Sequence, residues 1–185
     1  MVGGRRHRRD RVAERRRSLA PRRAVAPRGR GRGRAVPWVR GSGPVSLAFP
    51  SAEWVSAYGT AINASAAYRA ASAEWTHGPV ALVVNPQPEI GIGEPFGIWL
   101  DLDRGSCRGA RVVSQGEAEN AAFVITGDYG RWKQVIRKEL GPIAGIMQRK
   151  LTLKGSLPIV VRFVKSAEEL VQAATQVPTR FLDEG

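Results

Sequence analysis

The chain has 185 residues, a net charge of +13 and one cysteine, Cys107. No apolar run reaches the roughly 18 residues that span a bilayer, and no signal-peptide core follows the basic amino terminus. A lone cysteine excludes an intramolecular disulfide and a cysteine-based metal site. The sequence therefore predicts a soluble protein of a reducing compartment.

Charge divides the chain at residue 44. Residues 1–44 hold 15 arginines against Asp10 and Glu14, whereas cations and anions balance in the remainder. The segment has too few apolar side chains to offset the entropy lost on ordering, so we expect a disordered Arg/Gly-rich tail. Residues 45–185 are numerous enough to form one domain with its own core.

Three interpretations of the tail stay open. Its Arg-Gly run, Gly29–Arg34, could neutralise the phosphates of nucleic acid or of an acidic membrane surface. Abundant arginines and few acids are also typical of a mitochondrial targeting peptide. We favour the third interpretation, in which residues 1–44 are translated upstream sequence and the natural chain starts near Val45. Sequencing the amino terminus of the native protein tests it.

Helical spacing begins after Ser51, which can cap a helix that has Glu53 in its first turn. Apolar side chains then recur every three or four residues from Trp54 to Trp75, which predicts one long helix. The continuous apolar run Val80–Val84 lies between Gly-Pro and Asn-Pro turns and therefore predicts a central strand.

Three further strands are expected in the middle of the chain. Apolar and polar residues alternate over Phe96–Asp103, as in a half-buried strand. A turn at Asp103–Gly105 leads into a strand from Cys107 to Val113, and Phe123–Thr126 forms another. Hairpin-length connections favour antiparallel pairing.

Two short helices are expected next. Asp128 can cap a helix with apolar residues on one face, and Gly141-Pro142 ends that helix and begins a second. Leu151, Leu153 and Leu157 then alternate with polar residues, which predicts a strand.

A last helix should start at Ser166, which has capping-box spacing to Glu169, and continue to Val177. Together the elements predict an α+β fold with a mainly antiparallel sheet of about five strands covered by helices.

No catalytic constellation is present in the sequence. Asp101 and Asp103 share a strand face, but a turn follows at once, so we expect a solvated strand end. His77 is expected in an exposed loop, and Cys107 has no histidine partner and is expected to be buried. Gly91–Gly97 lacks the lysine and the following helix of a phosphate loop and is interpreted as a hairpin loop.

A set of short motifs carries a family resemblance. They are Phe49–Trp54, Leu100–Cys107, Lys138–Pro142, the Ile146-Met147 pair before two basic residues, and Lys150–Gly155. The set resembles the sterol carrier protein 2 (SCP2) sterol-binding domain family, bacterial stand-alone type, over about Phe49 to Phe181. Where that family usually has Gly-Lys before the last strand, this chain has Arg149-Lys150.

The resemblance implies an apolar tunnel between the sheet and the two short helices. It also implies non-catalytic binding or transfer of a fatty acid, fatty acyl-CoA, sterol or phospholipid, without cofactor or metal, with transient membrane contact. The bacterial cytoplasm is the implied location. The expected ligand-binding residues are Ile98, Leu100, Phe123, Trp132, Val135, Ile136, Ile143, Ile146, Met147 and Leu153.

Other interpretations of these residues stay open. The same side chains could simply complete the core of an ordinary domain. The chain could then be a ligand-free accessory module for an acyl-handling enzyme, or a nucleic-acid binder through its tail. An acyl hydrolase would need a nucleophile with a base in reach, and the sequence offers none.

Overall fold

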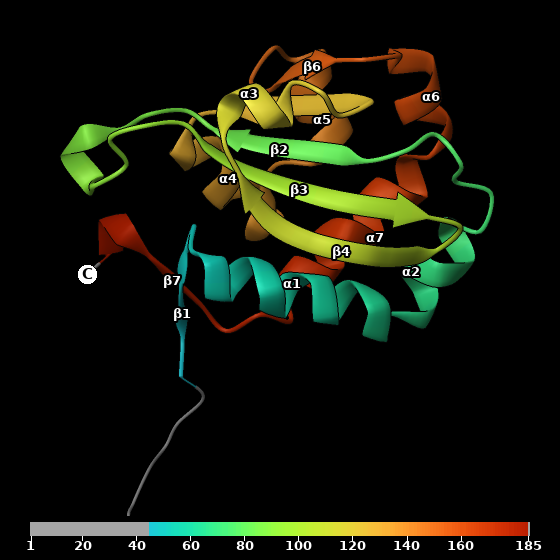
Figure 1. The fold of residues 1–185 in the computed structure, drawn as a ribbon, viewed down its shortest axis with the longest axis horizontal. Helices are drawn as coiled ribbons and strands as arrows, with labels where there is room; N and C mark the ends of the chain where they lie inside the picture. The colour runs from blue at the N-terminus through green and yellow to red at the C-terminus, as the bar shows by residue number, and fades with distance from the viewer. Residues whose placement is uncertain (1–44, 185) are drawn as a thin grey trace, which may run out of the picture. The chain divides into compact units, whose positions relative to one another are not determined.

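The computed structural model describes residues 45–184, so the predictions for residues 1–44 lie outside it. A five-stranded sheet has the order β4-β3-β2-β5-β6 (Figure 1). Its strands are β2 (Val80–Val84), β3 (Phe96–Asp103), β4 (Ser106–Val113), β5 (Phe123–Gly127) and β6 (Thr152–Lys154). β2 and β5 are parallel and the other pairs are antiparallel. The α+β fold with a mainly antiparallel sheet is confirmed.

Helices cover the sheet unequally. The described helices are α1 (Ala52–Ala64), α2 (Ala66–Ala71), α3 (Gln115–Ala118), α4 (Tyr129–Ile136), α5 (Pro142–Met147), α6 (Leu157–Arg162) and α7 (Val164–Ala174). In Figure 1 α3 crosses the face of the sheet nearest the viewer, whereas α4, α5 and α7 lie behind it. α1 runs beside β4 and packs on α7.

A close approach fixes the position of α1. A Cβ atom at Gly59 would lie 2.7 Å from the Cβ of Ala110 in β4, which is closer than side chains pack. Only glycine therefore allows α1 to lie so near the sheet. The approach sets the helix face that carries Trp54 and Tyr58 against the core, where both are buried.

A second, two-stranded sheet fastens the beginning of the domain to its end. β1 (Leu47–Phe49) pairs in parallel with β7 (Thr179–Phe181). The Tyr129 hydroxyl donates to the Phe49 carbonyl at 3.1 Å and accepts from the Leu182 N–H at 2.7 Å. One α4 side chain thus ties both terminal segments together.

The prediction of one long helix is wrong. Ser65 adopts extended backbone angles, ends α1, and begins α2 by accepting from the Tyr68 N–H through its Oγ at 3.0 Å. A serine side chain can replace a helical partner of the backbone in this way, which breaks a helix that apolar spacing alone makes continuous. Trp75 lies beyond the end of α2.

Predictions for the last third of the chain are partly wrong. β6 stops at Lys154, and Leu157 is the first residue of α6 instead of a strand residue, because Pro158 favours the first turn of a helix. Ser166 does not cap a helix: α7 begins at Val164, and the Ser166 hydroxyl is buried inside the domain.

The expected helix cap at Asp128 also differs in detail. Asp128 stands at the position before α4, but its side chain makes no capping bond there. Its Oδ1 accepts instead from Asn85 Nδ2 at 2.7 Å, which links the end of β2 to the start of α4. The Ser51 cap is confirmed, since its Oγ accepts from the Trp54 N–H at 3.1 Å.

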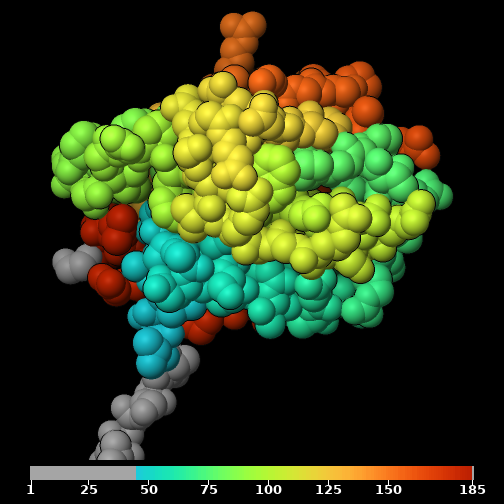
Figure 2. All heavy atoms as spheres, in the orientation of Figure 1, coloured from blue at the N-terminus to red at the C-terminus, as the bar shows by residue number. Residues whose placement is uncertain are grey.

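The loop between β2 and β3 projects from the sheet (Figures 1 and 2). It contains a short 3₁₀ turn, Pro88–Ile90, closed by an antiparallel bridge between Gln87 and Ile92. Since it joins two antiparallel strands, the hairpin interpretation is confirmed for residues 91–95, whereas Phe96 and Gly97 already belong to β3. Among residues 45–184, no helix is both long and apolar enough to cross a membrane.

Candidate ligand cavity

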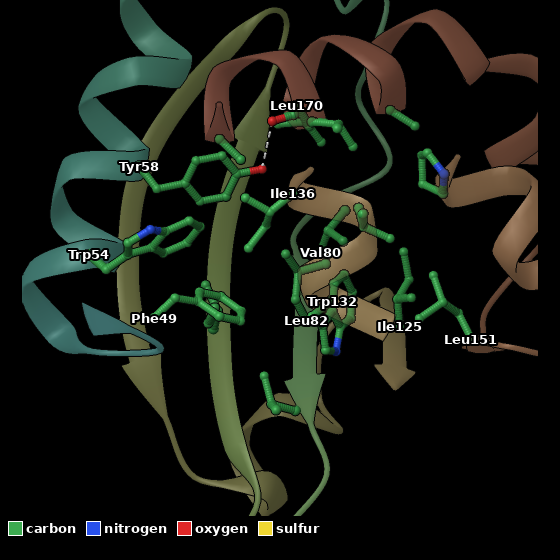
Figure 3. Close-up of a pocket in the computed structure, with 17 residues that line it drawn as sticks. Phe49, Trp54, Tyr58, Val80, Leu82, Ile125, Trp132, Ile136, Leu151 and Leu170 are labelled. Atoms are coloured by element: carbon green, nitrogen blue, oxygen red, sulfur yellow. Dashed lines mark hydrogen bonds between the residues drawn. The ribbon is translucent and has the colours of Figure 1, made fainter. Parts of the chain in front are cut away.

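A cavity of about 80 Å³ lies between the helix-covered face of the sheet and α1, α4 and α7. We call it the front cavity. Strand alternation supplies its floor, because Val80, Leu82 and Val84 of β2 point one way while Ala81 and Val83 pack in a separate cluster on the other face. Figure 3 shows side chains from the sheet and from three helices converging on this space.

Aromatic rings from three elements wall the front cavity, and their polar atoms are bonded outside it. Trp54 Nε1 donates to Thr179 Oγ1 at 2.8 Å, the Tyr58 hydroxyl to the Leu170 carbonyl at 3.1 Å, and Trp132 Nε1 to a strand carbonyl at 2.9 Å. The Phe49 ring meets Trp54 edge-on, with centroids 4.8 Å apart. Anchored rings present only apolar surface to the cavity.

The front cavity is electrically neutral. None of its lining residues is charged. Burial raises the pKa of Tyr58 above its usual value, so its hydroxyl stays protonated. A carboxylate or phosphate placed here would lose its hydration without gaining a partner, which costs several kcal/mol. The site therefore suits an uncharged apolar group and excludes an ionic one.

A second space, the rear cavity, has a volume of about 60 Å³. It is lined from α2, α6, α7 and the sheet. Four residues line both cavities and form the partition between them: Val80, Ile125, Ala167 and Leu170. Within residues 45–184 the expected tunnel is divided into two neighbouring cavities, which lie between the sheet and the helices.

The structure places five of the predicted ligand-binding residues at these cavities. Ile98, Trp132, Val135 and Ile136 line the front cavity, and Phe123 lines the rear one. Periodicity located the α4 side chains because the inward face of that helix is buried as a continuous stripe. The structure thus brings the strand residue Ile98 and three α4 residues together around the front cavity.

The other predicted residues lie elsewhere. Leu100 is fully buried in the core, and Ile143 packs against the core from α5. Ile146 and Leu153 line a surface groove of about 380 Å³ beside β6. Met147 is 65% exposed. None of the five lines the front or the rear cavity.

Several cavity residues were not among the predicted ones. Trp54 and Tyr58 of α1 share a helix face at a spacing of four residues, which predicts a helix but does not show that this face borders a cavity. Leu82 was hidden in a continuous apolar run that does not reveal which residues face which side. Phe49 depends on the β1–β7 pairing, for which the sequence gives no local signal.

A surface groove leads toward the front cavity. It has a volume of about 330 Å³ and lies between α7 and the junction of α4 with α5. Pro142 and Val171 line both this groove and the front cavity. These two half-buried side chains therefore separate the cavity from solvent.

The residues that could suggest catalysis have other roles. Asp101 and Asp103 flank the exposed Arg108, whose guanidinium lies 2.8 Å from Asp101 and 3.5 Å from Asp103, so the strand end is solvated as expected. Burial raises the pKa of the Cys107 thiol, which is buried as expected. His77 lies in the loop between α2 and β2 as expected, but it is half-buried and packs against Trp75 instead of being fully exposed. Within residues 45–184, no cluster of His, Cys, Asp and Glu is arranged to hold a metal.

Comparison with known proteins agrees with this architecture. A crystal structure of a sterol carrier protein 2 is 36% identical, with a TM-score of 0.64, over 69% of this chain and 97% of that one. The solution structure of a conserved hypothetical protein from Thermus thermophilus, described as a possible sterol carrier protein, is 35% identical, with a TM-score of 0.64, over 70% of this chain and 90% of that one. No curated protein matches the chain.

The model of the SCP-2 sterol transfer family matches residues 57–168. The match includes α2 to α6 and all five strands of the main sheet, and therefore most of the two cavities. Membership supports the binding or transfer of hydrophobic ligands in general. The chain belongs to the SCP-2 sterol transfer family.

Proposed function

We propose that this protein binds one long apolar ligand, a fatty acid, fatty acyl-CoA, sterol or phospholipid, and carries it between apolar environments. The front cavity supports the proposal, because its lining is uncharged and its aromatic rings are anchored by hydrogen bonds that point away from it. An ordinary core would fill such a space with side chains.

The size of the cavities implies that the ligand must widen them. A dry cavity of about 150 Å³ is large enough for benzene, whereas the front cavity measures about 80 Å³. The most direct widening merges the two cavities, which requires Ala167 and Leu170 of α7 to move away from the sheet residues Val80 and Ile125. All but Val80 of these partition residues are half-buried.

Apolar transfer energy is sufficient for useful affinity. A chain of about sixteen carbons gains roughly 0.8 kcal/mol per buried methylene, about 13 kcal/mol in all, before the costs of association, ordering and cavity opening. Micromolar binding survives those costs. Because no charged residue lines the front cavity, a charged headgroup stays near the mouth at Pro142 and Val171.

The proposed role is non-catalytic. Neither cavity lining contains His, Asp, Glu, Lys or Arg, so the hydroxyls that line the rear cavity have no base to activate them. The bacterial cytoplasmic location stays a prediction, as does any nucleic-acid contact of the tail.

Transfer requires contact with a membrane, and one segment of the chain carries exposed side chains suited to it. Residues 141–167 contain five cationic side chains and no acidic one. Met147 and Val161 in this stretch are 65% and 45% exposed. A segment that combines cations with exposed apolar side chains favours the surface of an anionic bilayer. Reversing the charge of the exposed Lys150 should slow ligand transfer to anionic vesicles, whereas the same change at the exposed Arg180 should not.

Native mass spectrometry of the gently purified full chain, followed by solvent extraction, tests the carrier role. We expect a bound lipid at one per chain, or uptake of one added palmitate. The small volumes favour a second candidate, a ligand-free accessory module for an acyl-handling enzyme. A mass that stays that of the bare chain after fatty acid, acyl-CoA and phospholipid are added would support that alternative and overturn the carrier role.

A further inference from the structure

The rear cavity differs from the front cavity in carrying hydroxyl groups on part of its wall. Tyr68 comes from α2, Ser72 directly follows α2, and Ser166 comes from α7. The rest of the lining is apolar and includes the rings of Trp75 and Phe163, whose centroids are 5.1 Å apart. A buried hydroxyl cluster in an apolar cavity needs hydrogen-bond partners.

Each serine hydroxyl has one proton, and this fixes which of Ser72 and Ser166 donates in the hydrogen bond between them. The Ser166 hydroxyl donates its only proton to the Ala71 carbonyl at 3.0 Å. Ser72 and Ser166 lie 2.7 Å apart, oxygen to oxygen, so Ser72 must be the donor in that pair. The Ser72 oxygen consequently keeps its capacity to accept a hydrogen bond.

The third hydroxyl of the rear cavity, that of Tyr68, is not part of this serine hydrogen-bond chain. Tyr68 is 1% exposed, and hydrogen bonding of its hydroxyl with Ser72 lowers its pKa, although within residues 45–184 the two oxygens do not reach the geometry of a well-formed hydrogen bond. Burial raises the pKa of Tyr68 to about 12, so the group is a neutral donor. Every fully enclosed side-chain oxygen or nitrogen in the described residues is bonded. The Tyr68 oxygen therefore borders open space, and Tyr68 lines the rear cavity.

We propose that the rear cavity receives a neutral hydroxyl group on the buried end of the ligand. That hydroxyl accepts a hydrogen bond from Tyr68 and donates one to Ser72, so both its roles are satisfied. A methyl group leaves Tyr68 without a partner, and a carboxylate meets no cation, since none lines the cavity. The inference rests on the proposed carrier function and narrows its ligands to long apolar molecules with a terminal hydroxyl.

Matched ligand pairs test the inference in the full chain. Dodecanoic, tetradecanoic and hexadecanoic acids are compared with their ω-hydroxy counterparts, which differ only at the buried end, so any attraction of the carboxylate to the basic tail cancels. At the chain length that reaches the rear cavity, the wild type should bind both members of a pair within about threefold. Tyr68→Phe should weaken the hydroxy acid about tenfold and leave the parent acid unchanged.

Tyr58→Phe is the matched control, because it removes a buried hydroxyl from a tyrosine that lines the front cavity, and this hydroxyl is already bonded to the Leu170 carbonyl. It should alter both members of a pair by the same factor. A second measurement does not depend on a variant that folds: the wild type should bind the ω-hydroxy acid better than the ω-methoxy acid, which cannot donate.

The outcomes separate this inference from the carrier role. An ω-hydroxyl that weakens binding equally in the wild type and in Tyr68→Phe, at every chain length, overturns the hydroxyl subsite and leaves the carrier role standing. If no acid of either series binds, both fail.

Discussion

The two faces of the main sheet are packed in opposite ways. On the α3 face, small residues such as Ala81, Val83 and Ala118 meet directly, and none of the residues in their cluster lines either cavity. The space-filling view shows the segment around α3 covering this face (Figure 2). On the other face, larger side chains, including three tryptophans, pack less completely and leave the two cavities.

The contrast shows that side-chain volume alone does not fill a core. Small residues can approach until they touch, whereas a ring whose polar atom is bonded at a fixed point cannot move into a neighbouring gap. Trp54, Tyr58 and Trp132 are each held in this way. Space on this face is therefore maintained by hydrogen bonds.

The largest expected effect comes from placing the same bulky residue on adjacent positions of β2. Leu82 faces the front cavity and Val83 faces α3. Leu82→Trp should fill the cavity, keep the midpoint of thermal unfolding within a few degrees, and weaken palmitate binding at least tenfold. Val83→Trp should cost about 3 kcal/mol or more of unfolding free energy, because the α3 face has no room. Equal destabilisation by the two variants, measured by urea unfolding, would refute the contrast.

Alkaline pH should lower the unfolding free energy through the buried tyrosines on the cavity side of the sheet. Burial raises the pKa of Tyr58 and Tyr68 above the ordinary value of 10.0, in Tyr68 to about 12. A raised folded-state pKa means that stability is full below pH 10 and is lost as the pH rises toward 12. Tyr68 should account for up to about 2 kcal/mol of that loss. Urea unfolding at pH 8 and 11 measures it, and Tyr68→Phe should lose less stability than the wild type over that interval.

Matched tryptophan substitutions on the two faces should have unequal effects. Trp132→Phe removes the hydrogen bond from the indole Nε1 to the Val83 carbonyl, which should cost about 1 kcal/mol. Trp99→Phe changes a half-buried ring that packs beside the α3 cluster and should cost less. Chemical denaturation compares the two, and a larger loss in Trp99→Phe contradicts the anchoring argument.

The smallest expected effect concerns the carboxyl-terminal segment. Glu184 pairs with Lys133 and with Arg137, and hydrogen bonding to Lys133 lowers its pKa below the ordinary 4.5. A lowered folded-state pKa means that the stabilisation is present above pH 4.5 and fades as the pH falls through the folded value. Hydrogen exchange of the Leu182 amide should therefore be less protected at pH 3 than at pH 6. Glu184→Gln should abolish most of this difference; an unchanged profile in the variant contradicts the assignment.

Sequence periodicity predicted the elements whose neighbours are close along the chain. The alternation in β3 and the apolar stripe of α4 appear in the structure as expected. Failures occurred where one residue redirects the backbone, as Ser65 does by ending one helix and capping the next. Apolar spacing carries no information about such local hydrogen bonds.

Half of the predicted ligand-binding residues do not line either cavity, and for those on α5 the reason is the orientation of that helix. α5 is a short helix that packs through Gly145, where a Cβ atom would lie 2.9 Å from Leu151. Because the glycine face points inward, the neighbouring Met147 points outward, the reverse of what apolar character suggests. The orientation of a helix with a small inward face depends on its partners, and a single sequence does not contain that information.

The parallel pairing of β1 with β7 has a mechanical consequence. Force applied outward at both ends of the domain pulls the start of β1 and the end of β7 in opposite directions along the strands, so the ladder is loaded in shear and its hydrogen bonds bear the load together. An unfolding motor that pulls on either end must break the β1–β7 ladder before it unfolds the five-stranded sheet. The two hydrogen bonds of the Tyr129 hydroxyl, one to each terminal segment, must break at the same stage.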